Sequence, residues 1–269
     1  MKKQMRVGLV VEGNATSSPV LRLACLKEEL GPIKSVGLQV ARRVSNFMRA
    51  GYAVAEYQDL DCAQLILLRL PDSQTPRVVA EICESRLAFG EMCFVLCESW
   101  LTTDVLIPLR RLGAQIASVM SVGPLSDNCF VVEGDAGAVR RTKRLLSQCE
   151  TRVIELRPGT KALYFAANLL STALAIPLFQ LAQQTLRESG VAGNDLAVLT
   201  NEWADLLQDR VRKGGRGTWG GPLAECSEEV ANEHFRQVAV QNPELAATLQ
   251  EWLSLARRQM EKKARGQGA

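Results

Sequence analysis

The chain has 269 residues, of which 47% are apolar, 23% charged and 5% aromatic. This length and balance are typical of two modest globular domains or one large one, and they exclude a collagen-like or wholly disordered protein. Thirty-two Lys and Arg against 29 Asp and Glu leave a formal net charge of +3, which is too even to indicate a nucleic-acid partner. We therefore expect a small-molecule ligand and no nucleic acid.

The chain holds a single histidine, His234, and eight cysteines. A single imidazole excludes a His-rich metal site, so we expect no metal. A Ser-His-Asp triad would have no spare histidine. The cysteines are scattered without a CxxC pair, and we interpret them as reduced, small apolar residues. The N-terminal apolar run is too short for a signal peptide, which together with reduced thiols favours a cytoplasmic protein.

The first 158 residues alternate short apolar runs with longer segments of helical periodicity. This alternation is typical of βα units, so we predict an α/β domain with a mostly parallel sheet over residues 1–158. The predicted strands are 6–11, 33–38, 52–57, 65–71, 92–99, 114–122, 128–135 and 152–156. The predicted helices are 17–31, 39–51, 72–86, 102–113 and 135–150.

From Thr160 onward the chain shows no strand-like run, and apolar-periodic segments continue to the end. Pro158 and Gly159 stop the last strand, so we predict an all-helical domain over residues 159–269. Its stretch 162–186 has no charged residue and is long enough to span a bilayer of about 30 Å. Six polar side chains and Pro177 favour instead a helix buried against its own domain and a partner subunit. We therefore predict a homodimer and no membrane span.

The first strand leads into a turn, Val11-Glu12-Gly13-Asn14-Ala15-Thr16, where a dinucleotide pyrophosphate would sit at a helix N-terminus. Compared with G-x-G-x-x-G, the turn keeps Gly13 and lacks both outer glycines. A β-branched residue forced into a left-handed backbone at position 11 would cost about 1–2 kcal/mol. The Glu12 carboxylate would disfavour a nearby phosphate by about 1–4 kcal/mol. Gly13 still permits close backbone approach, so nucleotide binding at Gly13, Asn14 and Ala15 stays open.

Two further segments would line a bound nucleotide. Arg42 and Arg43 follow the second predicted strand, and if a nucleotide binds they favour NADP over NAD, although two solvated arginines are the simpler interpretation. The fourth predicted strand ends in Leu70, Pro71 and Asp72 at the carboxyl edge of the sheet, where open α/β sheets bind ligands. The same three residues are also compatible with an ordinary strand exit.

Several stretches, in order along the chain, carry a family resemblance. They are RVGLVVEGNA, LLRLPDSQTPRVVAEI, TDVLIPLRRLGAQIASV, FVVEGDAGAV and GGPLAECSEEVANEHF. With them the chain resembles Rossmann-like proteins that carry a C-terminal helical domain of unknown function, relatives of pyrroline-5-carboxylate reductase and of the 6-phosphogluconate dehydrogenase superfamily. The resemblance implies a Rossmann domain, a helical dimerisation domain and an NAD(P)-linked reductase activity.

The chain departs from this family's pattern around the expected site. The segment 97–101, Cys-Glu-Ser-Trp-Leu, stands where relatives have a His-Ser-Ser-Gly-like turn. The segment 118–121 stands where relatives have a His-Pro pair, and Phe165 stands where they often have His. These lost imidazoles keep a second interpretation open: a non-catalytic homodimer that has lost the nucleotide and serves as a ligand-binding or scaffold protein.

A polar stripe remains on the first helix of the predicted second domain. Its members, Lys161, Tyr164, Asn168 and Thr172, are spaced 3, 4 and 4 residues apart and so share one helical face. The resemblance implies that Lys161 and Asn168 bind substrate and assist proton transfer; the plainer alternative is a lysine at the helix start that faces water. The leading prediction is an NADP-linked oxidoreductase, a reductase or dehydrogenase of a small carbonyl or imine.

Overall fold

The computed structural model describes residues 6–13, 18–123, 128–213 and 226–266. The chain divides into two compact units, unit 1 over Met1–Ala175 and unit 2 over Ile176–Ala269.

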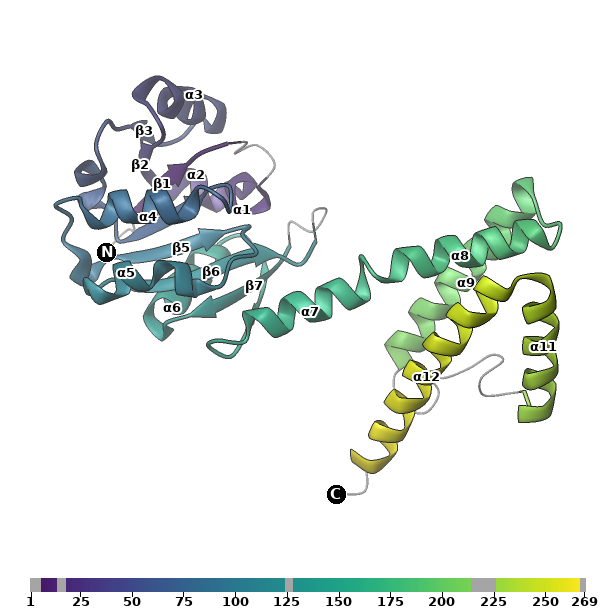
Figure 1. The fold of residues 1–269 in the computed structure, drawn as a ribbon. Coiled ribbons are helices and arrows are strands. Elements are labelled where there is room, and N and C mark those ends of the chain that lie inside the picture. Colours follow the sequence, from purple (N-terminus) through teal and green to yellow (C-terminus); the bar gives the residue numbers. More distant parts are fainter. Residues whose placement is uncertain (1–5, 14–17, 124–127, 214–225, 267–269) are drawn as a thin grey trace. The chain divides into compact units, whose positions relative to one another are not determined.

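Unit 1 is built on an eight-stranded sheet in the order β3-β2-β1-β4-β5-β6-β7-β8 (Figure 1). Adjacent strands pair in parallel except β6 and β7, which are antiparallel. The order 3-2-1-4-5-6 of the first six strands is that of a Rossmann fold, so the predicted fold class is confirmed. The strands are β1 (Val7–Val11), β2 (Leu30–Lys34), β3 (Tyr52–Ala53), β4 (Leu65–Arg69), β5 (Cys93–Cys97), β6 (Gln115–Ser121), β7 (Cys129–Gly134) and β8 (Arg152–Glu155).

Apolar layers cover both faces of the sheet, which explains why β1, β4 and β5 are continuous apolar runs. One layer is completed by α1 (Pro19–Arg22), α2 (Ala24–Glu29), α3 (Leu38–Met48) and α6 (Ala136–Ser147). The other is completed by α4 (Thr75–Cys83), α5 (Ile107–Arg111) and the 3-10 helices η2 (Tyr57–Cys62), η3 (Phe89–Glu91) and η4 (Thr103–Leu106).

The segment between β1 and α3 differs from its prediction. The expected helix 17–31 forms two short helices, because the backbone at Leu23 is extended. Strand β2 then begins at Leu30, earlier than expected, and includes Gly31 and Pro32. Both residues are depleted in strands, so the pattern concealed this start. The predicted continuation of the strand to residue 38 is also wrong, because Gly37 is the N-cap of α3.

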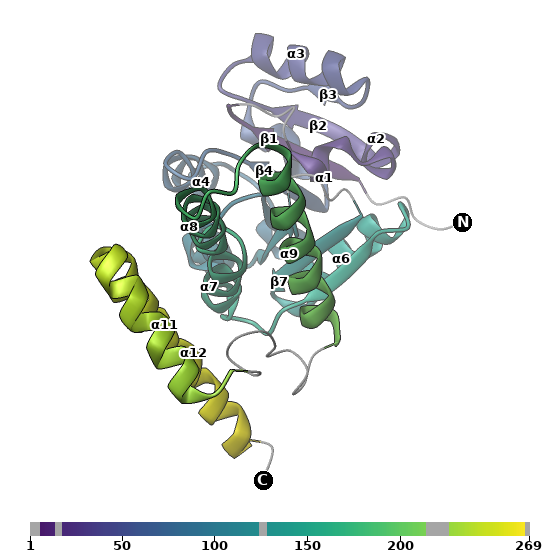
Figure 2. The ribbon, with the colours of Figure 1, turned by 90° about the vertical axis from the view of Figure 1, so that its right-hand side faces the viewer.

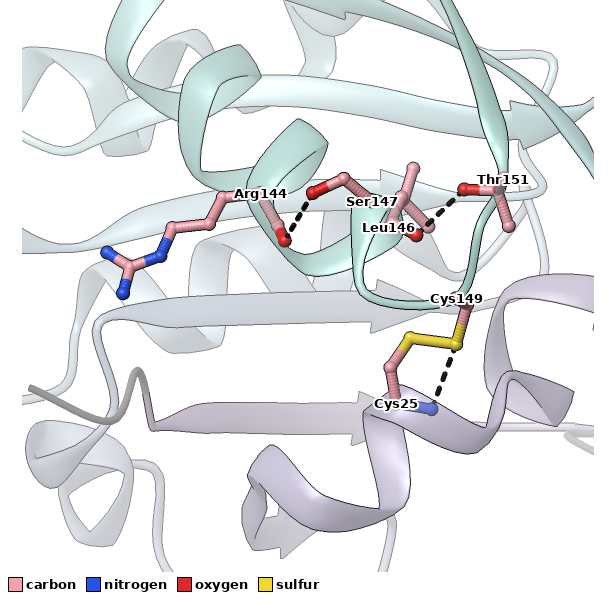
Figure 3. The surroundings of a disulfide bond; sticks show 6 residues. All are labelled: Cys25, Arg144, Leu146, Ser147, Cys149 and Thr151. Carbon is pink, nitrogen blue, oxygen red and sulfur yellow. Dashed lines mark hydrogen bonds between the residues drawn. A yellow bond between two sulfur atoms is a disulfide. The ribbon is translucent and has the colours of Figure 1, made fainter. Parts of the chain in front are cut away.

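Cys25 of α2 and Cys149, which follows α6, form a disulfide with their Cα atoms 5.7 Å apart (Figure 3). The backbone N–H of Cys25 also donates to the Cys149 sulfur at 3.0 Å. The prediction that all eight cysteines are reduced is therefore wrong for this pair. The contact was hidden because 124 residues separate two positions that fold onto the same face of the sheet. Cytoplasmic localisation loses this support and stays a prediction.

The described residues after β8 contain helices and no strand, as predicted. In unit 2, Gln183 of α8 donates to Thr200 of α9 at 3.4 Å, and the two helices run side by side (Figures 1 and 2). Unit 1 includes α7, which packs on the sheet domain through Lys161 and Tyr164, and the boundary predicted at residue 158 stays a prediction. The helices are α7 (Lys161–Ser171), α8 (Ala175–Glu188), α9 (Gly193–Lys213), α11 (Glu228–Gln241) and α12 (Pro243–Gly266).

One stretch of the described chain, Lys161–Glu188, is long and apolar enough to cross a membrane by length and composition alone. The structure interrupts this stretch between Ser171 and Ala175, where α7 ends and α8 begins. The Thr172 hydroxyl donates to the backbone oxygen of Asn168 at 2.7 Å at this break.

Candidate functional site

The strand order reverses between β1 and β4, and their carboxyl ends meet at this switch point. The backbone N–H of Glu12 donates to the Arg69 oxygen at 3.0 Å, which holds the two strand exits together. Gly13 has a φ of +70°, and a Cβ added there would lie 3.2 Å from Cγ of Pro71. The structure thus brings Gly13 next to the predicted exit Leu70-Pro71-Asp72. Asn14 and Ala15 lie outside the described residues.

Val11 occupies the first glycine position of the fingerprint, but it does not adopt the strained left-handed backbone considered there. It is the last residue of β1 and is 1% exposed within the apolar core. It is not among the non-glycine residues with positive φ. The left-handed turn falls two residues later, at Gly13, where the backbone adopts it without a Cβ penalty.

The Glu12 carboxylate is ion-paired, which reduces the expected repulsion of a phosphate. Arg77 of α4 donates from Nη2 to both carboxylate oxygens, at 2.8 and 2.7 Å. Arg77 also pairs with Glu81, which accepts a hydrogen bond from the Tyr57 hydroxyl at 2.9 Å. Arg77 lies 65 residues beyond Glu12, and no local pattern in the sequence links the two.

Lys161 is buried and does not face water, so the plainer alternative for this residue is wrong. Its side chain is 3% exposed, and Nζ donates to the backbone oxygen of Leu101 at 2.6 Å. Loss of hydration lowers the pKa of Lys161 to about 8, although the charges of Glu133 and Asp72 act in the opposite direction. The Ser99 hydroxyl donates to Asp72 at 2.6 Å and accepts from the Leu101 N–H at 3.1 Å. A continuous chain of contacts therefore connects Asp72 to Lys161.

Glu133, at the end of β7, holds the turn that leads into α7. It is 2% exposed, and its carboxylate accepts from the backbone N–H of Gly159 at 2.6 Å and from the Thr103 hydroxyl at 3.2 Å. Because Gly159 lies two residues before Lys161, Glu133 fixes the start of the helix as well as supplying a nearby negative charge. Glu133 carries part of the family resemblance, but this positioning role emerges only from the fold.

Asn168 lies apart from this chain of contacts. It lines a separate cavity of about 320 Å³ together with Glu98, Trp100 and Thr172, between the ends of β5 and β6, α1 and α7. Lys161 is not among the described residues that line this cavity, and a substrate shared by Lys161 and Asn168 stays a prediction. Between them on α7, Tyr164 stacks on Trp100 with ring centroids 6.4 Å apart.

Glu98 is a candidate site residue that sequence reasoning did not select. It follows β5 directly and adopts a left-handed backbone, with a φ of +53°. Its carboxylate accepts from the Ser121 backbone N–H at 3.2 Å and from the Ser121 hydroxyl at 3.3 Å. Burial raises the pKa of Glu98. The sequence feature that could have indicated Glu98 is its carboxylate in the segment 97–101, where the chain departs from the family pattern.

This fold and site define a Rossmann-type α/β protein with a helical C-terminal region. Residues 128–255 match the model of a domain of unknown function (DUF2520). No curated protein is significantly similar to the chain in sequence.

Solved structures share the fold along nearly the whole chain. A Bacteroides fragilis protein that has itself only been proposed as an NADP oxidoreductase is 16% identical, with a TM-score of 0.73 over 94% of this chain and 97% of that chain. A Myxococcus stipitatus imine reductase variant in complex with NAD+ is 11% identical, with a TM-score of 0.67 over 94% of both chains. A Coxiella burnetii pyrroline-5-carboxylate reductase is 12% identical, with a TM-score of 0.58 over 96% of this chain and 94% of that chain. The resemblance inferred from the sequence is thus confirmed at the level of fold.

Proposed function

We propose that the protein is an NADP-dependent reductase or dehydrogenase acting on a small carbonyl or imine. The observation that carries the proposal is the switch point, where Gly13 turns against Pro71 and Arg77 pairs with the adjacent Glu12. A phosphate at this edge would meet no uncompensated carboxylate from Glu12. Similarity in fold to an imine reductase and a pyrroline-5-carboxylate reductase supports the same class of reaction.

The residues at the switch point fit a dinucleotide. Gly13, with Asn14 and Ala15, would hold the phosphates, and the exit 70–72 would line the nicotinamide half. Between Lys34, the last residue of β2, and Arg43 there is no acidic residue to hold a ribose 2′-hydroxyl, and Arg42 and Arg43 are exposed on α3. These charges favour the 2′-phosphate of NADP. When bound, the nicotinamide would donate or accept the hydride.

Lys161 and Asn168 would serve the substrate. In the direction of reduction, the ammonium of Lys161 would give a proton to the oxygen or nitrogen that gains the electron pair. With its pKa lowered to about 8, this ammonium is charged at neutral pH and is a stronger acid than an ordinary lysine. The amide of Asn168 would orient the substrate from the wall of the cavity.

Calorimetric titration with NADPH and NADH tests the cofactor directly. We expect NADPH to bind more tightly than NADH. Arg77→Ala should weaken NADPH binding by about tenfold or more, because the Glu12 carboxylate would lose its partner. Arg86→Ala, an exposed arginine just after α4, is the matched control and should leave the affinity unchanged. An absence of heat at millimolar NADPH would remove the proposal.

A second candidate function is a non-catalytic homodimer that has lost the nucleotide. It is favoured by Val11, a core residue where the fingerprint has its first glycine, and by a carboxylate at Glu12. The double variant Val11→Gly with Glu12→Gly separates the two candidates. Gain of NADP binding by this variant, where the parent has none, would indicate a decayed site, whereas binding by the parent would exclude this candidate.

We also propose that unit 2 pairs with a second copy of the chain. Among its described residues the buried apolar ones are Leu196, Leu245 and Ala246, and α8 buries none. Large apolar side chains stay exposed instead, including Val211 at 65% and Leu207 at 49% on α9. So small a core does not stabilise a helical unit alone, and a second copy supplies matching apolar helices.

A further inference from the structure

The cavity that contains Asn168 combines an apolar wall with few polar groups, which is the general form of a small-molecule site. Pro19, Met120 and Val122 supply apolar surface, and Trp100 supplies an aromatic one. Among the described residues that line it, the charged side chain is that of Glu98.

The backbone at Glu98 is unusual for its position. Two other described non-glycine residues have a positive φ, Arg49 and Glu150, and both lie just after the ends of helices, where a left-handed residue is common. Glu98 instead follows a strand, and it lines a cavity. Backbone strain at such a place is typical of a ligand-binding residue, because the rest of the fold must maintain it.

The Glu98 carboxylate is anchored but not neutralised by an ion pair in the described part of the chain. Its hydrogen bonds from Ser121 fix its direction. Glu98 interacts electrostatically with groups on two neighbouring elements. These groups are Arg69 of β4 and, on α7, Lys161 and Tyr164. A half-buried carboxylate that forms no ion pair among the described residues attracts a ligand cation, because the two charges then interact partly shielded from water.

An aromatic surface lies beside this carboxylate. Trp100 stacks on Tyr164 and makes a T-shaped contact with Phe165, whose ring centroid lies 5.3 Å away. The indole lines the cavity and is 43% exposed. An organic cation is attracted to the face of an aromatic ring as well as to a carboxylate.

We propose that Glu98 makes this cavity selective for a small organic cation, a protonated amine or iminium that carries no carboxylate of its own. Glu98 supplies the opposite charge, Trp100 the aromatic surface, and Met120 and Val122 the contact for an apolar ring or chain. An amino or imino acid is disfavoured, because its carboxylate would enter a cavity that already contains Glu98. The inference rests on the proposed function only in taking this cavity as the substrate site.

Binding of three five-membered-ring compounds tests the selectivity: pyrrolidinium, neutral cyclopentanone and proline. Titrations followed by tryptophan fluorescence, with and without NADPH, should show pyrrolidinium binding at least tenfold more tightly than the other two. Glu98→Gln should lose that advantage while cyclopentanone binding stays the same. Glu84→Gln, an exposed carboxylate after α4, is the control and should change nothing.

Glu98→Asn provides a second neutral variant if the glutamine variant folds poorly, because asparagine tolerates a left-handed backbone. Equal binding of pyrrolidinium by the wild type and both neutral variants would overturn the inference, and so would tighter binding of proline. NADPH binding without pyrrolidinium binding would remove this inference alone. Pyrrolidinium binding without NADPH binding would keep it and remove the proposed reductase.

Discussion

Lys161 illustrates how one residue changes its chemistry through its surroundings. At the start of α7 its side chain is buried within unit 1, where Leu101 accepts a hydrogen bond and the residue is 3% exposed. The ammonium loses more hydration energy than Glu133 and Asp72 restore, so its pKa falls to about 8. Burial of this charge therefore opposes folding at neutral pH, and the opposition disappears once the lysine is neutral in both states.

This linkage predicts a pH-dependent difference in stability between the wild type and Lys161→Met. Between pH 8 and pH 10.5 the unfolded chain binds more protons at residue 161 than the folded chain, so wild-type stability rises with pH relative to the variant. The total rise should be about 3 kcal/mol. Urea unfolding at several pH values measures it. A difference between the wild type and Lys161→Met that stays constant over this pH range would contradict the predicted linkage.

At the scale of elements, the antiparallel pairing of β6 with β7 requires the two strand backbones to approach closely. Gly134 pairs with Ala117 of β6 and has a φ of +145°. A Cβ added at Gly134 would lie 2.5 Å from Cα of Ala117 and would also meet the Ile116 oxygen. These are backbone atoms, so no side-chain rotation relieves the clash. The same strand end carries Glu133, and displacement here would also move the turn before α7.

We therefore expect Gly134→Ala to lower the free energy of unfolding by at least about 2 kcal/mol. Gly90→Ala is the control, because a Cβ there meets nothing within 4 Å and the backbone is not left-handed. Its effect should stay within about 0.5 kcal/mol. Thermal or urea unfolding of both variants measures the difference, and equal stabilities would show that the two strands separate easily at this point.

At the scale of the whole molecule, the two units differ in how much apolar surface they bury. Unit 1 encloses two apolar layers on its sheet, whereas unit 2 leaves most of its apolar helix faces exposed. The chain has a mass of 29.5 kDa. We expect light scattering to give about twice this mass, because a second copy would cover the exposed faces.

A charge placed on α9 should dissociate this dimer. Leu207→Glu puts a carboxylate on an apolar residue that is 49% exposed, and it should shift the mass toward that of one chain at micromolar concentration. Gln208→Glu adds the same charge at the next, already polar position and should leave the mass unchanged. A wild-type protein that runs as a stable monomer would refute the proposed assembly.

The order of strands and helices, and with it the Rossmann class, was readable from the sequence, because apolar periodicity and Pro or Gly breaks are local properties of a chain. Gly13 and the exit 70–72 were readable for the same reason. Only the tertiary structure decided the pairing of Glu12 with Arg77, the disulfide of Cys25 and Cys149, and the left-handed Glu98 beside Asn168. Each joins segments far apart in the sequence, so its chemistry exists only once the sheet has brought those segments within contact.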